Sequence, residues 1–148
     1  MHTLSKKAFV AIEAVLYIAL HSGVEPVCGK NIGRYQGVAS RYLEHILQAL
    51  VHAGILRGQR GPKGGYFLAR ERRKITLGEI YEALMKIDAE PHIDHPLSAL
   101  NTKVIEPIWE EVQKHLVTEL AKVTVQDLCD RATKQGLEAE TKKPDFTI

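Results

Sequence analysis

The sequence predicts a mainly α-helical chain that contains one small β-hairpin and ends with a long helix. Helical periodicity over residues 5–21 and 107–122 indicates the helices. A Gly/Pro loop between two short apolar runs at residues 55–69 indicates the hairpin. With 148 residues, of which 45% are hydrophobic and 26% charged, the composition is ordinary for a globular protein of one or two small domains.

The first helix is expected over residues 5–21, which contain no Gly or Pro. Ser5 is a residue type that suits the N-cap, and Gly23 is expected to end the helix. A broad buried face is predicted at Phe9, Ile12, Leu16, Ile18, Ala19 and Leu20.

A pair of short helices is predicted next. Residues 30–36 are long enough for two turns, Gly37 supplies a turn, and a second helix runs over residues 39–53 until Gly54 stops it. Two short helices separated by a Gly-containing turn are typical of a helix-turn-helix, although many helical hairpins share the pattern. The second helix is expected to bury Leu43, Ile46, Leu47, Leu50 and Val51.

The hairpin that follows is basic. Residues 55–60 read as a strand, residues 61–65 (GPKGG) as a loop and residues 66–69 as a second strand. A basic hairpin directly after a helix-turn-helix predicts a winged helix. A phosphate-binding loop is excluded because Lys63 is followed by Gly64 and not by Ser or Thr.

The C-terminal half is predicted to hold three further helices. A capping box formed by Thr76 and Glu79 opens a helix that ends near Ile87, and residues 88–101 read as a loop. Residues 107–122 form the longest amphipathic segment, with Pro107 expected in its first turn. Residues 124–127 start a short last helix, and residues 133–148 read as a loose tail. The long helix carries an apolar stripe at Trp109, Val112, Leu116, Leu120 and Val123, which suits packing against another helix.

The net charge of +2 divides unevenly along the chain. Residues 1–74 carry 12 Lys/Arg and 4 Asp/Glu, a net charge of +8, and residues 75–148 carry 8 and 14, a net charge of −6. This asymmetry suggests a half that faces nucleic acid and a half with another role, or else chance clustering of solvated charge. No apolar run reaches the about 18 residues that span a membrane, and the N-terminus does not resemble a signal peptide, so we expect a cytoplasmic protein.

Four segments carry a family signature, namely SRYLE at 40–44, LVHAGIL at 50–56, RGPKGGYFLAR at 60–70 and ITLGEI at 75–80. Together they resemble the Rrf2 family of bacterial winged-helix transcription regulators, which includes an iron–sulfur cluster regulator, a nitric oxide sensor and a cysteine metabolism repressor. The match extends from the first helix to about residue 130, and its wing is the most specific part. The resemblance implies a homodimer whose long helices cross between subunits and whose two DNA-binding domains face a palindrome-like operator.

The predicted DNA interface lies at the start of helix 39–53 and on the hairpin. Arg41 can pair with a guanine edge or contact only phosphate. Glu44 matches a family position that modulates base choice, or is simply solvated. The glycines of the loop are expected to turn with positive φ and to approach DNA closely. The predicted DNA-binding residues are Ser40, Arg41, Tyr42, Glu44, Arg57, Arg60, Gly61, Lys63, Gly64 and Gly65.

Residues around this interface have other expected roles. Tyr66 is expected to pack the wing onto the body of the domain. Five basic residues are predicted to surround the interface or, alternatively, to form a solvated face. They are Arg57, Arg70, Arg72, Arg73 and Lys74.

The cysteine count separates this chain from the cluster-binding members that it resembles. Those members carry three cysteines between the capping-box helix and the long helix, whereas residues 88–106 contain none, so we expect no iron–sulfur cluster. Cys28 is a candidate redox switch or a small packed residue, and Cys129 is expected to pack in the last helix or to serve as a partner thiol. Weak candidates for metal ligands are His92, Asp94 and His95, which are otherwise solvated.

The sequence therefore predicts a winged helix-turn-helix DNA-binding domain (1–87), a sensing or linker loop (88–106), a dimerisation helix with a short last helix (107–132) and a polar tail (133–148). The predicted function is a homodimeric, sequence-specific, cluster-free transcriptional repressor that answers to a small-molecule or protein effector. The alternative is a protein-interaction module that docks an enzyme or regulator through its acidic half. No nucleophile–base pair or catalytic metal motif predicts an enzyme.

Overall fold

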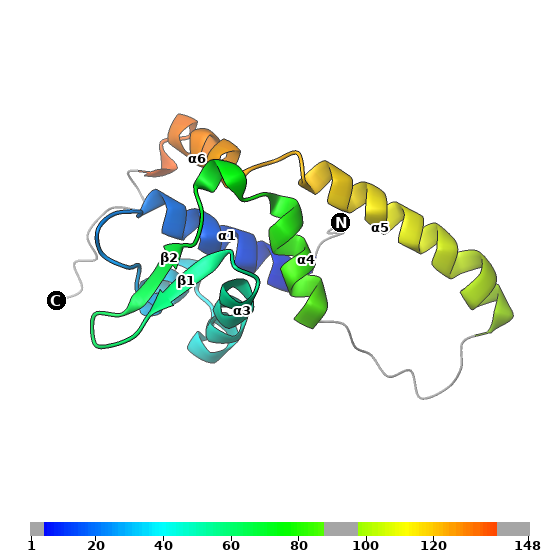
Figure 1. Ribbon diagram of the computed structural model, residues 1–148, viewed down its shortest axis with the longest axis horizontal. Helices are drawn as coiled ribbons and strands as arrows, with labels where there is room; N and C mark the ends of the chain where they lie inside the picture. Colours follow the sequence, from blue (N-terminus) through cyan, green and yellow to red (C-terminus); the bar gives the residue numbers. More distant parts are fainter. Residues whose placement is uncertain (1–4, 88–97, 139–148) are drawn as a thin grey trace.

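The computed structural model describes residues 5–87 and 98–138. Helices α1 to α4 and a two-stranded hairpin form the body, and α5 projects from it (Figure 1). This arrangement confirms the predicted mainly helical, winged helix-turn-helix fold. The elements are α1 (Lys6–Leu20), α2 (Gly29–Gln36), α3 (Ser40–His52), β1 (Leu56–Gln59), β2 (Gly65–Leu68), η1 (Arg72–Lys74), α4 (Leu77–Ile87), η2 (Asn101–Ile105), α5 (Glu106–Leu120) and α6 (Val125–Lys134). Within the described ranges, no helix has the length and apolarity needed to cross a membrane.

Helix α1 is the centre of the core. The Ser5 hydroxyl accepts a hydrogen bond from the Ala8 N–H at 3.3 Å, which confirms the predicted N-cap. The predicted burial of Phe9 is wrong, because its side chain is 46% exposed. Small side chains such as Ala11 and Ala14 line the most buried face and let neighbouring helices approach, which leaves Phe9 at the edge of that face. The helix ends at Leu20 with His21 as its C-cap, within one residue of the predicted end at residue 21.

The turn between α2 and α3 follows the predicted chemistry. Gly37 has a φ of 69°, and its N–H donates to the Gly33 carbonyl at 2.8 Å, which closes α2. As predicted, Leu43, Ile46, Leu47 and Leu50 of α3 are buried in the core, whereas Val51 is only partly buried.

The hairpin is tied to the start of α2. Strands β1 and β2 pair antiparallel with Leu56 opposite Leu68. Two backbone hydrogen bonds of 2.9 Å also join Val27 and Tyr66, so the residue before the α2 cap extends the small sheet. A Cβ added at Gly65 would lie 2.3 Å from the Val27 carbonyl oxygen, and only glycine permits this close approach.

Helix α4 begins at the predicted capping box. The Thr76 hydroxyl accepts from the Glu79 N–H at 3.2 Å, and a Glu79 carboxylate oxygen accepts from the Thr76 N–H at 3.0 Å. Thr124 and Asp127 form the same reciprocal pair at the start of α6. The first residues of α4 and of α6 lie side by side, and the Leu77 N–H donates a hydrogen bond to the Val123 carbonyl at 2.9 Å.

The long helix starts earlier than predicted. Residues 99–100 are already helical, and a π-helical stretch, η2, connects them to α5. Pro107 lies in the first turn of α5, as predicted, although the helical segment continues before it through η2. The wider π turn, in which the Glu106 N–H donates to the Asn101 carbonyl, accommodates a proline that has no N–H of its own.

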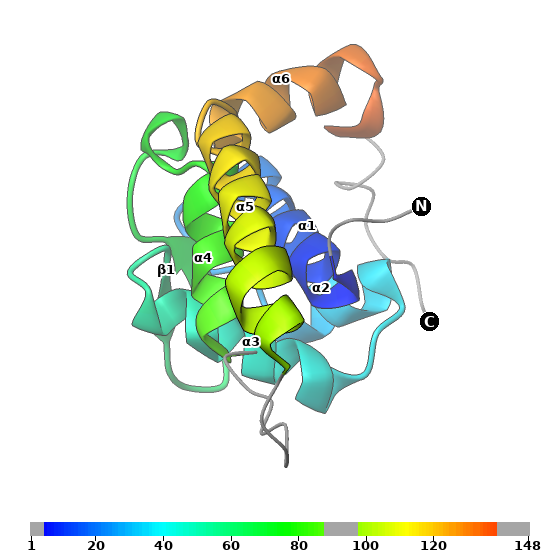
Figure 2. The same cartoon turned by 90° about the vertical axis from the view of Figure 1, so that its right-hand side faces the viewer.

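Helix α5 buries none of its residues. Its C-terminal half lies next to α4 (Figure 2). Only part of the predicted apolar stripe is uncovered, since Trp109 is 62% and Val112 51% exposed, whereas Leu116, Leu120 and Val123 are partly buried. Helix α6 reaches Lys134, so the first two residues of the predicted tail, 133 and 134, are helical.

Candidate nucleic-acid interface

A crevice of about 340 Å³ lies between the start of α2, the start of α3 and the hairpin. It brings together predicted interface residues from two separate segments, Ser40 and Glu44 of α3 with the wing glycines. Sequence reasoning did not include Lys30 and Gln59, which also line it. The crevice is lined by Cys28, Gly29, Lys30, Ser40, Leu43, Glu44, Leu47, Gln59, Gly61, Gly64, Gly65 and Tyr66.

The exposed edge of α3 presents three of the predicted residues to solvent. Ser40, Arg41 and Glu44 are exposed in the first two turns, at the end of the helix that a helix-turn-helix presents to base edges. Tyr42 is partly buried and packs against the hydrophobic core. These three side chains supply a hydroxyl, a guanidinium and a carboxylate, which are groups that read base edges and phosphates. His45, Gln48 and His52 of α3 are exposed as well.

Tyr66 packs the wing onto the body of the domain, as predicted, and lies near α3. Its ring packs against the core, and a Cβ added at Gly29 would lie 3.7 Å from it. Burial raises the pKa of the Tyr66 hydroxyl, and the nearby negative charge of Glu44 raises it further, while a hydrogen bond with Gln48 acts in the opposite direction. Sequence reasoning missed Gln48, because its partner lies in a different element.

The wing glycines are needed for two different reasons. Gly61 has a φ of 112°, as expected for a turn. The expectation of positive φ is wrong for Gly64 and Gly65, which are required instead by backbone crowding. A Cβ at Gly64 would lie 2.3 Å from the Gln59 carbonyl oxygen. The tight loop keeps Arg60 and Lys63 exposed near its tip.

Arg57 lies apart from this crevice. Its guanidinium carbon is 4.8 Å from the centre of the Phe67 ring, its partner in the strand register, and the two side chains line a different hollow. The structure therefore groups Arg57 with arginines that follow β2, and a contact between Arg57 and DNA remains a prediction.

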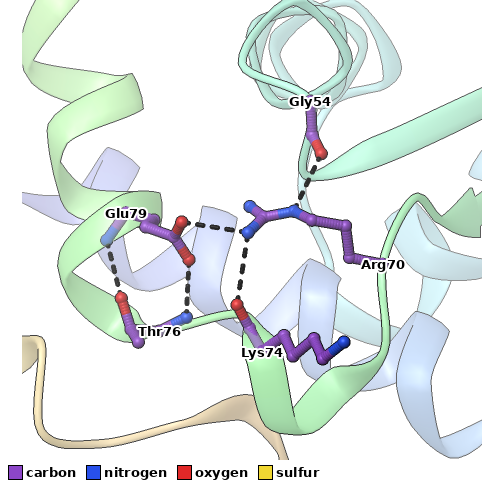
Figure 3. Close-up of polar contacts among 5 residues, drawn as sticks. All are labelled: Gly54, Arg70, Lys74, Thr76 and Glu79. Atoms are coloured by element: carbon purple, nitrogen blue, oxygen red, sulfur yellow. Dashed lines mark hydrogen bonds and ion pairs between the residues drawn. The ribbon is translucent and has the colours of Figure 1, made fainter.

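Arg70 is committed to the body of the domain (Figure 3). Its guanidinium donates to the Gly54 carbonyl at 3.4 Å, to the Lys74 carbonyl at 3.2 Å and to the Glu79 carboxylate at 3.0 Å. Arg73 is paired with Glu71 at 2.7 Å. The expected basic surround is therefore partly neutralised by intramolecular partners.

The two cysteines occupy different environments. Cys28 is the half-buried N-cap residue of α2 and lines the crevice. Cys129 is 3% exposed, and burial raises the pKa of its thiol, which agrees with the predicted packing role. Over residues 5–87 and 98–138, no three His, Cys, Asp or Glu side chains cluster as metal ligands would. The weak metal candidates His92, Asp94 and His95 lie outside the described residues.

Known proteins resemble this chain over most of its length. The Rrf2 family model, described as iron-dependent transcriptional regulator, matches residues 4–131. An HTH-type transcriptional regulator of Synechocystis is 32% identical over 126 residues, which cover 84% of this chain and 86% of that protein. The HTH-type regulator IscR of Vibrio atlanticus is 30% identical and is matched over 84% of this chain and 73% of its own.

Solved structures show the same fold. The structure of T. potens IscR superposes with a TM-score of 0.66 at 31% identity and covers 97% of this chain and 94% of that one. The structure of CymR, the global cysteine regulator of B. subtilis, gives a TM-score of 0.66 at 24% identity over 88% and 98% of the two chains.

Proposed function

Because the chain belongs to the Rrf2 family of transcriptional regulators, we propose that it is a sequence-specific DNA-binding repressor that acts as a homodimer. Its relatives are transcription regulators and not enzymes. The observation that carries the proposal is the crevice that joins Ser40 and Glu44 of the recognition helix to the wing glycines. The site chemistry consists of hydrogen-bonding and charged groups on a helix start, which suits base readout.

The recognition helix α3 enters the major groove, and the wing reaches the flanking backbone. Arg41 pairs with a guanine edge or a phosphate, while Glu44 accepts from cytosine or repels an unsuitable base edge. Arg60 and Lys63 contact phosphates or the minor groove. The proposed contact surface also includes Ser40, Tyr42 and the wing glycines. Arg57 is included because it lies on the hairpin, although its side chain lines a different hollow.

The homodimer forms through the apolar stripe of α5. Exposed hydrophobic surface on a projecting helix is costly in water, and a second copy of the same helix would cover it. Trp109 and Val112 of the stripe are more than half exposed, and so are the neighbouring Ile105 of η2 and Ile108 of α5. Two recognition helices presented by such a dimer would read two half-sites about one DNA turn apart.

The protein performs this role in the cytoplasm without an iron–sulfur cluster. The donor set does not fit the iron-dependent description of the family, because residues 88–106 contain no cysteine and the chain has only two. Those two lie in α6 and before α2, in separate environments. Residues 1–87 serve as the DNA-binding domain, residues 88–106 as the sensing loop for a small-molecule or protein effector, and residues 107–132 as the dimerisation region.

A mobility-shift assay with the DNA upstream of its own gene tests the proposal. Specific, salt-sensitive binding that is lost in Arg41→Ala supports it, because phosphate and base contacts depend on that charge. A pull-down that recovers one stoichiometric protein partner and no DNA would instead favour an interaction module that works through the acidic half.

A further inference from the structure

A second hollow, of about 570 Å³, lies where the end of α1, the strand β2, η1 and α6 meet. Figure 1 shows α6 and α3 on opposite sides of α1, so this hollow is separate from the proposed DNA crevice. Four arginines from three different segments line it, together with two carboxylates. Its polar lining consists of Ser22, Arg57, Arg70, Glu71, Arg72, Arg73, Gln126 and Glu138.

The positive charge of this hollow is only partly compensated. Arg73 pairs with Glu71 and Arg70 pairs with Glu79, but Arg57 and Arg72 have no carboxylate partner among the residues that the structure describes. Arg57 rests on the Phe67 ring, and the charge of Arg72 lowers the pKa of the nearby Cys129 thiol, although burial raises that pKa more. Glu138 also lines the hollow, where it accepts a hydrogen bond from Thr133 at 2.9 Å.

We propose that this hollow binds a small anion that carries two or more carboxylate or phosphate groups. The guanidinium of Arg57 and that of Arg72 each present a planar fork of donors that matches such groups. Ser22 adds a hydroxyl, and Gln126 adds an amide whose nitrogen also donates to Asp130 at 2.9 Å. The volume lies in the roughly 300–1,000 Å³ range of small-molecule sites. An aromatic ligand is less suited, because Arg57 already covers the Phe67 ring.

An anion in this position would contact both halves of the chain. It would join the base of the wing at Arg57 to η1 at Arg72 and to α6 at Gln126. Neutralising two guanidinium groups reduces the positive potential of the half that carries a net charge of +8, so operator affinity falls. This second effect rests on the proposed function, whereas binding of the anion itself does not.

The direct test is calorimetric titration of the full chain with citrate and, separately, with pyrophosphate at constant ionic strength and without DNA. We expect saturable binding of one anion per chain, and the preferred probe identifies a carboxylate or a phosphate ligand. Arg57→Gln and Arg72→Gln should each weaken binding about tenfold, because each removes a charge-assisted contact. Arg60→Gln is the matched control, since this arginine lies on the hairpin but does not line the hollow. Thermal unfolding checks that all three variants are folded.

Two results would overturn the proposal. The first is the absence of saturable binding by either probe, or an equal loss of binding in Arg60→Gln. The second result concerns DNA. If the anions do not bind and the DNA affinity of Arg57→Gln and of Arg72→Gln falls as much as that of Arg60→Gln, the hollow is instead a surface for DNA phosphates. Saturable anion binding with no specific DNA binding would leave the site intact and contradict only the proposed function.

Discussion

Arg70 and Glu79 form an ion pair, with Arg70 Nη1 3.0 Å from Glu79 Oε1, that joins the end of the wing to the first turn of α4. The same guanidinium donates to the Gly54 carbonyl just after the recognition helix. The side chains are 38% and 41% exposed, so the ion pair itself contributes at most about 1 kcal/mol. Its main effect is positional, because one residue contacts three segments that must be held in register to present a wing and a helix to DNA.

Two substitutions of Glu79 distinguish the contribution of the capping box to stability from that of the ion pair. Glutamine can still accept the Thr76 N–H, whereas alanine removes both interactions. We expect Glu79→Ala to lower the free energy of unfolding by about 1–2 kcal/mol and Glu79→Gln by less than about 1 kcal/mol. Urea denaturation measures both values. Equal losses in the two variants would show that the cap contributes nothing.

The contribution of Glu79 should depend on pH. Burial raises the pKa of its carboxyl, but the hydrogen bonds from Thr76 and the contact with Arg70 outweigh burial and lower the pKa below its ordinary value of 4.5. A group whose pKa is lowered by folding contributes stability above its unfolded pKa and loses it as the pH falls through the folded pKa. The stability difference between wild type and Glu79→Gln should therefore be full above pH 4.5 and shrink below it. A difference that grows on acidification would contradict this assignment.

Gly65→Ala should detach the wing from α2. The added methyl would lie 2.3 Å from the Val27 carbonyl oxygen, so the backbone must shift and the bridge between Val27 and Tyr66 is strained or lost. We expect a loss of about 1–3 kcal/mol in unfolding free energy and weaker DNA binding. Gly58→Ala is the matched control, because its methyl would meet only the Tyr66 ring at 4.0 Å. Similar behaviour of the two variants would argue against this tie.

Trp109→Glu should convert the proposed dimer into a monomer. A charge at the centre of an apolar seam leaves an unpaired carboxylate in the interface, and association does not repay its desolvation. Light scattering coupled to size-exclusion chromatography reads the mass directly, and DNA affinity should fall with it. Glu111→Ala alters an exposed position on the other side of α5 and should leave the dimer intact. A dimeric Trp109→Glu would place the interface elsewhere.

Local chemistry made much of this fold predictable. Ser5, Thr76 and Thr124 cap helices through hydrogen bonds to residues three positions away, so a short sequence window contains the whole signal. Gly37 likewise marks a left-handed turn that few other residues adopt. The spacing of apolar residues in α3 identified its buried face, because all the residues that pack on the core lie on one side of this helix.

The features that the sequence did not predict depend on contacts between distant segments or on uncommon backbone geometry. Pro107 correctly indicated a first helical turn, but nothing nearby indicates the π-helical stretch that precedes α5. Arg70 is one of several arginines in a basic run, and only its contact with a carbonyl 16 residues away distinguishes it. The separation of Arg57 from the crevice depends on which face of the hairpin packs on α3, and hence on the whole tertiary fold.

The most direct test of the central claim is a salt series of equilibrium binding to the DNA upstream of the gene, with wild type, Arg41→Ala and Arg60→Ala. We expect tight specific binding by wild type and a loss of about 1–3 kcal/mol in Arg41→Ala that relaxes specificity at one base pair. Arg60→Ala should weaken binding to all sequences alike and lower the salt slope by about one per subunit. Binding by wild type that is no tighter to this DNA than to unrelated DNA would contradict the account.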